Sequence, residues 1–228
     1  MPHDHLTPRS EPFIYVSWIA RYLAGERVCG YSYWVRSHYL LSAADMVPSD
    51  FDRVSWRAEH SALVRRRANE LRTDGWDVFC EEQNRFTLRG RQARATFGGK
   101  PDLVAFKAGE GLVEDCKTGT EKDSDIMQVR LYLYLMPLST EGERLRNCDK
   151  LNGVVAYAAG KPRVVPVDSI TGKFKEMVRD AVLHFAQDSE LAKAPAYAEC
   201  RWCDIAKSVC PERVERPPET TVSETDLF

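Results

Sequence analysis

The stretch Gly98–Tyr132, GGKPDLVAFKAGEGLVEDCKTGTEKDSDIMQVRLY, decides the fold of this chain. Two apolar runs within it, Leu103–Phe106 and Leu112–Lys117, have the length and turn-forming borders of β-strands. Asp123–Met136 is long enough for a helix, and Pro137 cannot continue one. The stretch therefore predicts two strands followed by a helix.

The second predicted strand carries acids on both faces. Alternate residues of a strand share a face, so Asp115 and Lys117 point one way and Glu114 and Cys116 point the other. A carboxylate can hold a hard divalent cation, and a lysine beside it can orient an attacking hydroxide. Asp102 ends Gly-Gly-Lys-Pro-Asp and could supply a second carboxylate. The pattern predicts a hydrolytic metal site that leaves Glu114 out.

Composition limits the class of protein. The 228 residues suffice for one domain with appendages, and the net charge of −2 gives no global attraction to nucleic acid. The longest apolar run, around Leu131–Leu138, is too short to cross a bilayer. The N-terminal residues, MPHDHLTPRSEP, lack the apolar core of a signal peptide. We expect a cytoplasmic protein that does not associate with membranes.

Seven cysteines occur, and three of them cluster as Cys200-x-x-Cys203-x6-Cys210. In a reducing compartment such a cluster indicates metal binding more often than disulfides. Four thiolates suit either zinc or an iron–sulfur cluster, and the spacing does not separate the two.

Other elements follow from periodicity and turn residues. Trp56–Thr73 is the clearest amphipathic helix, and it carries His60. Trp76–Leu88 is predicted as one long strand or hairpin arm, and Arg89–Lys100 as a loop or hairpin turn that could end in a strand. The remaining predicted elements are strands at Phe13–Val16, Val154–Ala158 and Arg163–Val167, a helix capped by Ser17 that runs to Leu23, and a long helix over Ile170–Ala192.

The order of these elements predicts an α/β core with a mixed sheet flanked by helices. The expected divisions are a flexible tail (1–12), an N-terminal helical segment with the first cluster cysteine (13–55), the core (56–192), a cysteine cluster (193–214) and a disordered tail (215–228).

Four motifs occur in order along this core. They are His60 on the first helix, Pro101-Asp102, Asp115-Cys116-Lys117, and Gln128-Val-Arg-Leu-Tyr132 on the following helix. The sequence resembles the PD-(D/E)XK nuclease superfamily, specifically its RecB-like branch, in which these motifs have the same order. The resemblance implies a restriction-endonuclease-like core and metal-dependent hydrolysis of phosphodiesters.

The resemblance also implies the role of each motif residue. Mg²⁺ or Mn²⁺ would be held by His60, Asp102, Asp115 and the backbone carbonyl of Cys116, and a histidine ligand would favour manganese. Lys117 would position the nucleophile or stabilise the transition-state charge. The helix face that bears Gln128 and Tyr132 would contact DNA or support the active site.

The cysteines resemble those of the CRISPR-associated RecB-like exonucleases and the AddB-type nuclease domains. In those proteins, one cysteine before the core and three after it hold a 4Fe–4S cluster, which implies Cys29, Cys200, Cys203 and Cys210 here. The stand-alone CRISPR-associated type suits this short chain. It implies an exonuclease on single-stranded DNA or DNA ends that processes DNA for spacer acquisition beside integrase proteins.

Two other functions remain open. One is a RecB- or AddB-like exonuclease in recombination, repair or a phage. The other is a non-catalytic DNA-binding or redox-sensing iron–sulfur protein, against which the intact acids and lysine argue.

Two groups of basic residues and one aromatic group could also contact DNA. Arg89, Arg91, Arg94 and Lys100 could neutralise phosphates, although a solvated loop explains them equally well. For Arg65–Arg67 a solvated helix face is the preferred interpretation. Tyr31, Tyr33 and Trp34 could stack on bases, but packing is the better explanation for them.

Overall fold

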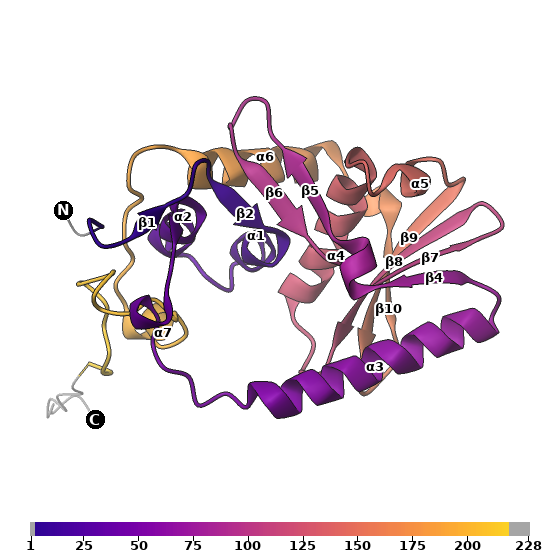
Figure 1. The fold of residues 1–228 in the computed structure, drawn as a ribbon, viewed down its shortest axis with the longest axis horizontal. Helices are drawn as coiled ribbons and strands as arrows, with labels where there is room; N and C mark the ends of the chain where they lie inside the picture. The colour runs from indigo at the N-terminus through magenta and orange to yellow at the C-terminus, as the bar shows by residue number, and fades with distance from the viewer. Residues whose placement is uncertain (1–2, 219–228) are drawn as a thin grey trace, which may run out of the picture.

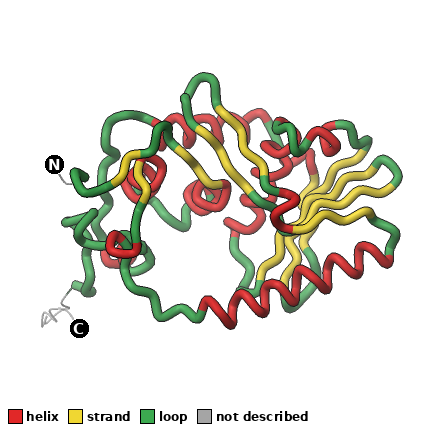
Figure 2. The backbone as a smooth tube through the Cα atoms, viewed as in Figure 1, coloured by secondary structure: helices red, strands yellow, loops and turns green. Residues whose placement is uncertain are grey.

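A five-stranded mixed sheet forms the centre of the molecule, whose computed structural model describes residues 3–218 (Figures 1 and 2). Its strand order is β10-β9-β8-β7-β4; β8 and β9 run parallel and the other pairs antiparallel. The strands are β4 (Asp77–Cys80), β7 (Leu103–Lys107), β8 (Glu110–Lys117), β9 (Lys150–Tyr157) and β10 (Arg163–Pro166). The predicted mixed α/β fold is confirmed.

Helices cover both faces of this sheet. Helix α3 (Arg53–Thr73) lies on one face and α4 (Asp123–Leu135) on the other. Successive residues of a strand point to opposite faces of the sheet. Leu112 therefore packs with α3, whereas Val113 and Val155 pack with α4. On the α3 side, the buried helix residues are Leu63, Val64, Ala68 and Leu71.

A second layer adjoins the α4 face. It contains a three-stranded sheet of order β2-β6-β5 in which β2 is parallel to β6, together with helices α1, α2 and α6. Their bounds are β2 (Phe13–Tyr15), β5 (Phe86–Arg89), β6 (Thr96–Gly99), α1 (Val16–Leu23), α2 (Gly30–His38) and α6 (Gly172–Ala186). Residues 13–55 therefore supply a strand and two helices to the same layers as residues 56–192.

Short elements complete the described chain. They are β1 (Thr7–Pro8), β3 (Tyr39–Leu40), α5 (Glu143–Arg146), α7 (Tyr197–Cys200) and the 3-10 turns η1 (Ala43–Asp45), η2 (Glu81–Asn84), η3 (Met136–Leu138) and η4 (Val167–Ser169). Over residues 3–218, no helix has the length and apolar character needed to span a bilayer.

The predicted flexible tail at 1–12 is wrong for the residues described. Strand β1 pairs with β3, Leu6 is buried, and His3 lies against the Tyr31 ring with centroids 6.0 Å apart. These contacts involve residues distant in sequence, which a polar composition did not reveal. The predicted disordered tail at 215–228 falls largely at 219–228, outside the described residues.

The prediction of one long strand over Trp76–Leu88 is wrong, whereas the alternative of a hairpin arm holds for β5, which pairs antiparallel with β6. Glu81 takes a positive φ of 44°, and the turn η2 separates β4 from β5, which join different sheets. The Asn84 side chain stabilises this break by donating hydrogen bonds to the carbonyl oxygens of Phe79 (3.0 Å) and Pro101 (3.2 Å).

Several helix ends differ from prediction, and at α3 and α6 a side chain binds backbone groups at the helix end. Helix α6 stops at Ala186 instead of Ala192, since Trp34 Nε1 donates to the carbonyl of Gln187 at 2.9 Å. Helix α3 starts three residues before Trp56, where the Asp52 carboxylate accepts two backbone N–H groups. Helix α1 starts at Val16, so Ser17 is not its N-cap.

Candidate active site

Two buried carboxylates meet where β7 begins and β8 ends. Asp102 is 8 % exposed and Asp115 is 3 % exposed. Asp102 Oδ2 accepts the backbone N–H of Cys116 at 2.7 Å and lies 3.3 Å from His60 Nε2 on α3. The pairing of β7 with β8 thus places the acids of the two motifs together, and α3 adds an imidazole.

Lys117, Gln128 and Tyr132 extend this cluster toward α4. Lys117 Nζ lies 2.7 Å from Asp115 Oδ2 and donates to Gln128 Oε1 at 3.1 Å. Gln128 Nε2 lies 3.0 Å from both Asp115 Oδ1 and the Tyr132 hydroxyl. Gln128 and Tyr132 share a helix face because they are four residues apart. The two predicted groups, from β8 and α4, therefore form one connected network.

Burial and neighbouring charges shift the pKa values of three groups in the network. Burial raises the pKa of Asp115 to about 6; Lys117 opposes this shift and Asp102 adds to it. The Asp102 hydrogen bond raises the pKa of His60. Burial alone would lower the pKa of Lys117, but the carboxylates of Asp115 and Asp125 outweigh it and raise that pKa. The lysine is therefore charged at neutral pH.

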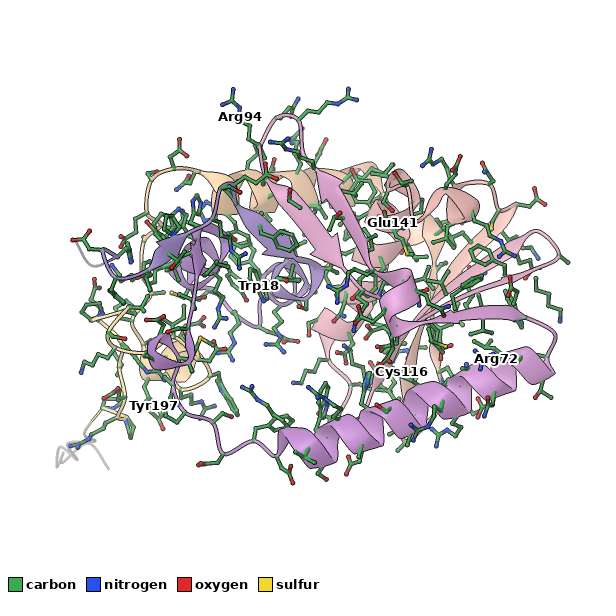
Figure 3. All side chains as sticks on the ribbon, viewed as in Figure 1. Trp18, Arg72, Arg94, Cys116, Glu141 and Tyr197 are labelled. Carbon is green, nitrogen blue, oxygen red and sulfur yellow. The ribbon has the colours of Figure 1, made fainter. Side chains whose placement is uncertain are left out.

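The chemistry of the donors fits a hard divalent ion. Asp115 Oδ2 is buried and makes no hydrogen bond, although it contacts the lysine ammonium. Carboxylate oxygens with an imidazole suit Mn²⁺ or Mg²⁺. Within residues 3–218, no three His, Cys, Asp or Glu side chains form a group that could hold a metal ion as they stand. Cys116 places its backbone in the site and its side chain among the apolar residues facing α3 (Figure 3).

Sequence reasoning missed Asp125. Its Oδ1 lies 3.9 Å from Lys117 Nζ, and its Oδ2 accepts the Tyr157 hydroxyl at 3.2 Å. The spacing of Asp125 and Gln128, three residues apart on one helix, was the signal that could have identified it.

The basic hairpin contributes less to the site than its sequence allowed. Arg89 pairs with Glu11, and Arg94 stands at the hairpin tip, away from Cys116 (Figure 3). Arg91 is exposed in the same tip. Only Lys100 adjoins the network, since its carbonyl oxygen accepts the Tyr132 hydroxyl at 3.2 Å.

The other predicted group, Cys29, Cys200, Cys203 and Cys210, lines one small cavity of about 20 Å³. Burial and neighbouring cysteines raise the pKa of Cys210, while burial does so for Cys203 despite nearby arginines. Four cysteines on one cavity supply the donor type that an iron–sulfur cluster or a zinc ion needs, although in the described residues their thiols do not stand close enough to form a metal-holding group. Cys80 and Cys148 do not line this cavity.

Hydrogen bonds join the chain segments around the cysteines. The Glu199 carboxylate accepts the backbone N–H of Cys29 at 3.2 Å, and Arg27 donates to the carbonyl of Trp202 at 2.8 Å. The Tyr31 hydroxyl donates to Val209 O at 2.6 Å. Tyr31, Tyr33 and Trp34 are all buried, which confirms that they pack instead of stacking on a ligand.

Comparison with known proteins gives a structural likeness but no family. No protein-family model matches the chain, and no curated protein matches it. A crystal structure of a protein designated SSO0001 is similar, with 15 % sequence identity and a TM-score of 0.44 over 86 % of this chain and 84 % of that one. A function for this protein therefore has to be argued from its own residues.

Proposed function

We propose that this protein is a metal-dependent deoxyribonuclease with a restriction-endonuclease-like core, of the RecB-like branch of the PD-(D/E)XK superfamily. One observation carries the proposal. Asp102, Asp115, Lys117 and Gln128 come from two strands and a helix and form one buried polar network with His60. Burying acids, a charged lysine and an imidazole together lowers the stability of the folded protein, so such a cluster indicates a functional site.

The residues divide the chemistry between them. Mg²⁺ or Mn²⁺ held by Asp102, Asp115, His60 and the Cys116 carbonyl would supply Lewis acidity toward a phosphodiester and its attacking water. Lys117 places a fixed positive charge 2.7 Å from Asp115, where it can hold the nucleophile or offset developing phosphate charge. Gln128 orients both groups, because it donates to the Asp115 carboxylate and accepts from Lys117.

A 4Fe–4S cluster bound by Cys29, Cys200, Cys203 and Cys210 completes the proposal. Its role is structural, since these thiols join a loop near the N-terminus to the C-terminal segment. By resemblance, the substrate is single-stranded DNA or a DNA end, and the role is cytoplasmic processing of DNA for CRISPR spacer acquisition with integrase proteins. A zinc ion on the same thiols is the competing assignment.

A cleavage assay on end-labelled DNA tests the activity. Purified protein should shorten single-stranded or duplex substrates with Mn²⁺ or Mg²⁺ and not with EDTA. Lys117→Ala should slow cleavage by about 10²-fold or more, as expected for loss of electrostatic stabilisation. Glu110→Gln is the matched control, because Glu110 lies at the far end of β8 and forms an ion pair with Lys150, away from the site. Metal-independent cleavage, or equal rates for the two variants, would refute the proposed site.

A further inference from the structure

The side of α3 that faces the sheet is lined by different types of residue in its two halves. From Leu63 onward this stripe packs on the sheet and is apolar apart from Arg67, which pairs with the buried Glu114 carboxylate. Continued toward the N-terminus at helical spacing, the same stripe holds Arg53, Trp56, Arg57 and His60. No acid lies in this part of the stripe, so the helix presents two cations and two aromatic rings where the apolar packing ends.

Nothing in the described chain covers these first turns. Residues 51–59 are all exposed, and α3 extends past the five-stranded sheet toward α7 (Figure 1). Trp56 is 42 % exposed, and neither Arg53 nor Arg57 has a hydrogen-bond or ion-pair partner within residues 3–218. Arg53 also borders a cavity of about 540 Å³ that is shared with Trp18 and Arg36. The space beside the stripe is therefore open.

The stripe is continuous with the candidate active site. The Trp56 indole stacks on the His60 imidazole with centroids 5.2 Å apart and planes inclined by 26°. His60 Nε2 in turn lies 3.3 Å from the Asp102 carboxylate. Phe51, 57 % exposed, lies 6.2 Å from Trp56. An aromatic series thus runs from solvent to the buried carboxylates.

We propose that Arg53, Trp56 and Arg57 form a binding platform for the unpaired strand of the DNA substrate. A base stacks on the free face of Trp56, and the two guanidinium groups contact flanking phosphates. The same indole fixes the plane of His60, so Trp56 positions both the strand and an active-site imidazole. Because stacked neighbours cover both faces of every base inside a duplex, the platform favours single-stranded DNA over blunt duplex DNA, which exposes base faces at its two ends alone. This inference rests on the proposed nuclease function, which it deepens by naming the substrate form and its contacts.

Binding measurements separate the platform from catalysis. Fluorescence anisotropy with a labelled single-stranded oligonucleotide, in EDTA, reports affinity without cleavage. Trp56→Ala should weaken binding by about 5- to 100-fold, the range for loss of one base–aromatic stack, and Trp56→Phe should recover most of it. Trp202→Ala, at a tryptophan that is 64 % exposed on another segment, is the matched control and should bind as the native protein does.

The two arginines of the platform should affect the salt dependence of DNA binding. The Arg53→Ala/Arg57→Ala variant should reduce the slope of log affinity against log salt by about 1.4, since each single-strand phosphate contributes about 0.7. Arg65→Ala/Arg72→Ala, on the same helix but off this stripe, should leave the slope unchanged. Blunt duplex binding should change less than twofold in Trp56→Ala.

The outcomes distinguish the platform from the nuclease. If Trp56→Ala and Trp202→Ala bind single strands equally, or if blunt duplex loses as much affinity as single strand, the platform is wrong even when Mn²⁺-dependent cleavage is present. If the binding pattern holds and the native protein cleaves nothing with Mn²⁺, the platform stands and the nuclease proposal fails. Circular dichroism of each variant checks that the fold is retained.

Discussion

Glu114 and Asp115 are neighbours on β8, yet their carboxylates lie on opposite faces of the sheet. Asp115 faces α4 and joins the candidate active site. Glu114 is fully buried against α3, where Arg67 Nε and Nη2 donate to its two oxygens at 2.7 and 2.9 Å. Strand alternation correctly excluded Glu114 from the site. The preferred interpretation of Arg67 as a solvated residue was wrong, because its partner is distant in sequence.

This buried pair yields a stability prediction. Arg67→Met leaves the Glu114 carboxylate without a partner in the interior, which should lower the free energy of unfolding by about 3–5 kcal/mol. Urea denaturation measures the loss. Arg66→Met is the control and should stay within about 0.5 kcal/mol, because Arg66 is exposed and its ion pair with Glu70 is weak. Equal stability of the two variants would show that Glu114 is not held as described.

His38 gives a prediction about pH. Burial lowers its pKa below the usual 6.5, and its Nε2 lies 3.1 Å from the carbonyl oxygen of Phe185. The unfolded chain takes up a proton on His38 at a higher pH than the folded chain does. The contribution to stability is therefore complete above about pH 6.5 and declines as pH falls toward the lower folded pKa. His38→Gln should lose this acid-side decline, which urea denaturation at pH 5 to 8 would reveal. Parallel stability profiles of the two proteins would contradict the assignment.

The helices and strands that could be predicted from the sequence are those whose own residues determine them. The β8 strand and the α4 helix could be predicted from the sequence, because apolar periodicity specifies both and Pro137 ends the helix. The alternation of β8 side chains between the two faces of the sheet could be predicted as well. The break between β4 and β5 was not, because Asn84 stabilises it through backbone groups brought close by folding. The short α6 depends likewise on Trp34, which lies about 150 residues earlier in the chain.

The contact between α4 and β9 carries an element-scale prediction. Gly153 lets the helix approach the strand, and a Cβ there would overlap Val129 and come within 3.0 Å of Leu133. Gly153→Ala should therefore cost about 1–3 kcal/mol by overpacking. It should also slow cleavage, since displacing α4 moves Gln128 away from Asp115. Gly172→Ala, where the added Cβ meets nothing within 4 Å, is the control and should leave the cleavage rate unchanged without lowering the unfolding midpoint. Unaltered cleavage in Gly153→Ala would show that α4 does not set the site geometry.

Across the whole molecule, the cysteine cavity joins segments about 170 residues apart. The four positions followed from resemblance, and their convergence on one cavity depends on the docking of α2 and α7, which no local pattern encodes. A bound group there would stabilise the folded protein, since the unfolded chain holds no such site.

Anaerobic purification should therefore give a brown protein with about four irons per chain, the content of a 4Fe–4S cluster. Cys200→Ser should lose the colour and lower the melting temperature, whereas Cys148→Ser should change neither, because Cys148 lies outside the cavity. A visible spectrum, metal analysis and thermal melts give the answer. A colourless protein that contains zinc would overturn the iron–sulfur assignment while leaving the nuclease proposal intact.

The most direct test of the central proposal is the rate of Mn²⁺-dependent cleavage of end-labelled single-stranded DNA by the native protein and by Asp115→Ala. Asp115 is the residue on which the network converges, since Lys117 and Gln128 both contact its carboxylate. The proposal predicts that Asp115→Ala abolishes cleavage while the purified protein keeps its brown colour. Cleavage that survives in a folded, coloured Asp115→Ala protein would contradict it.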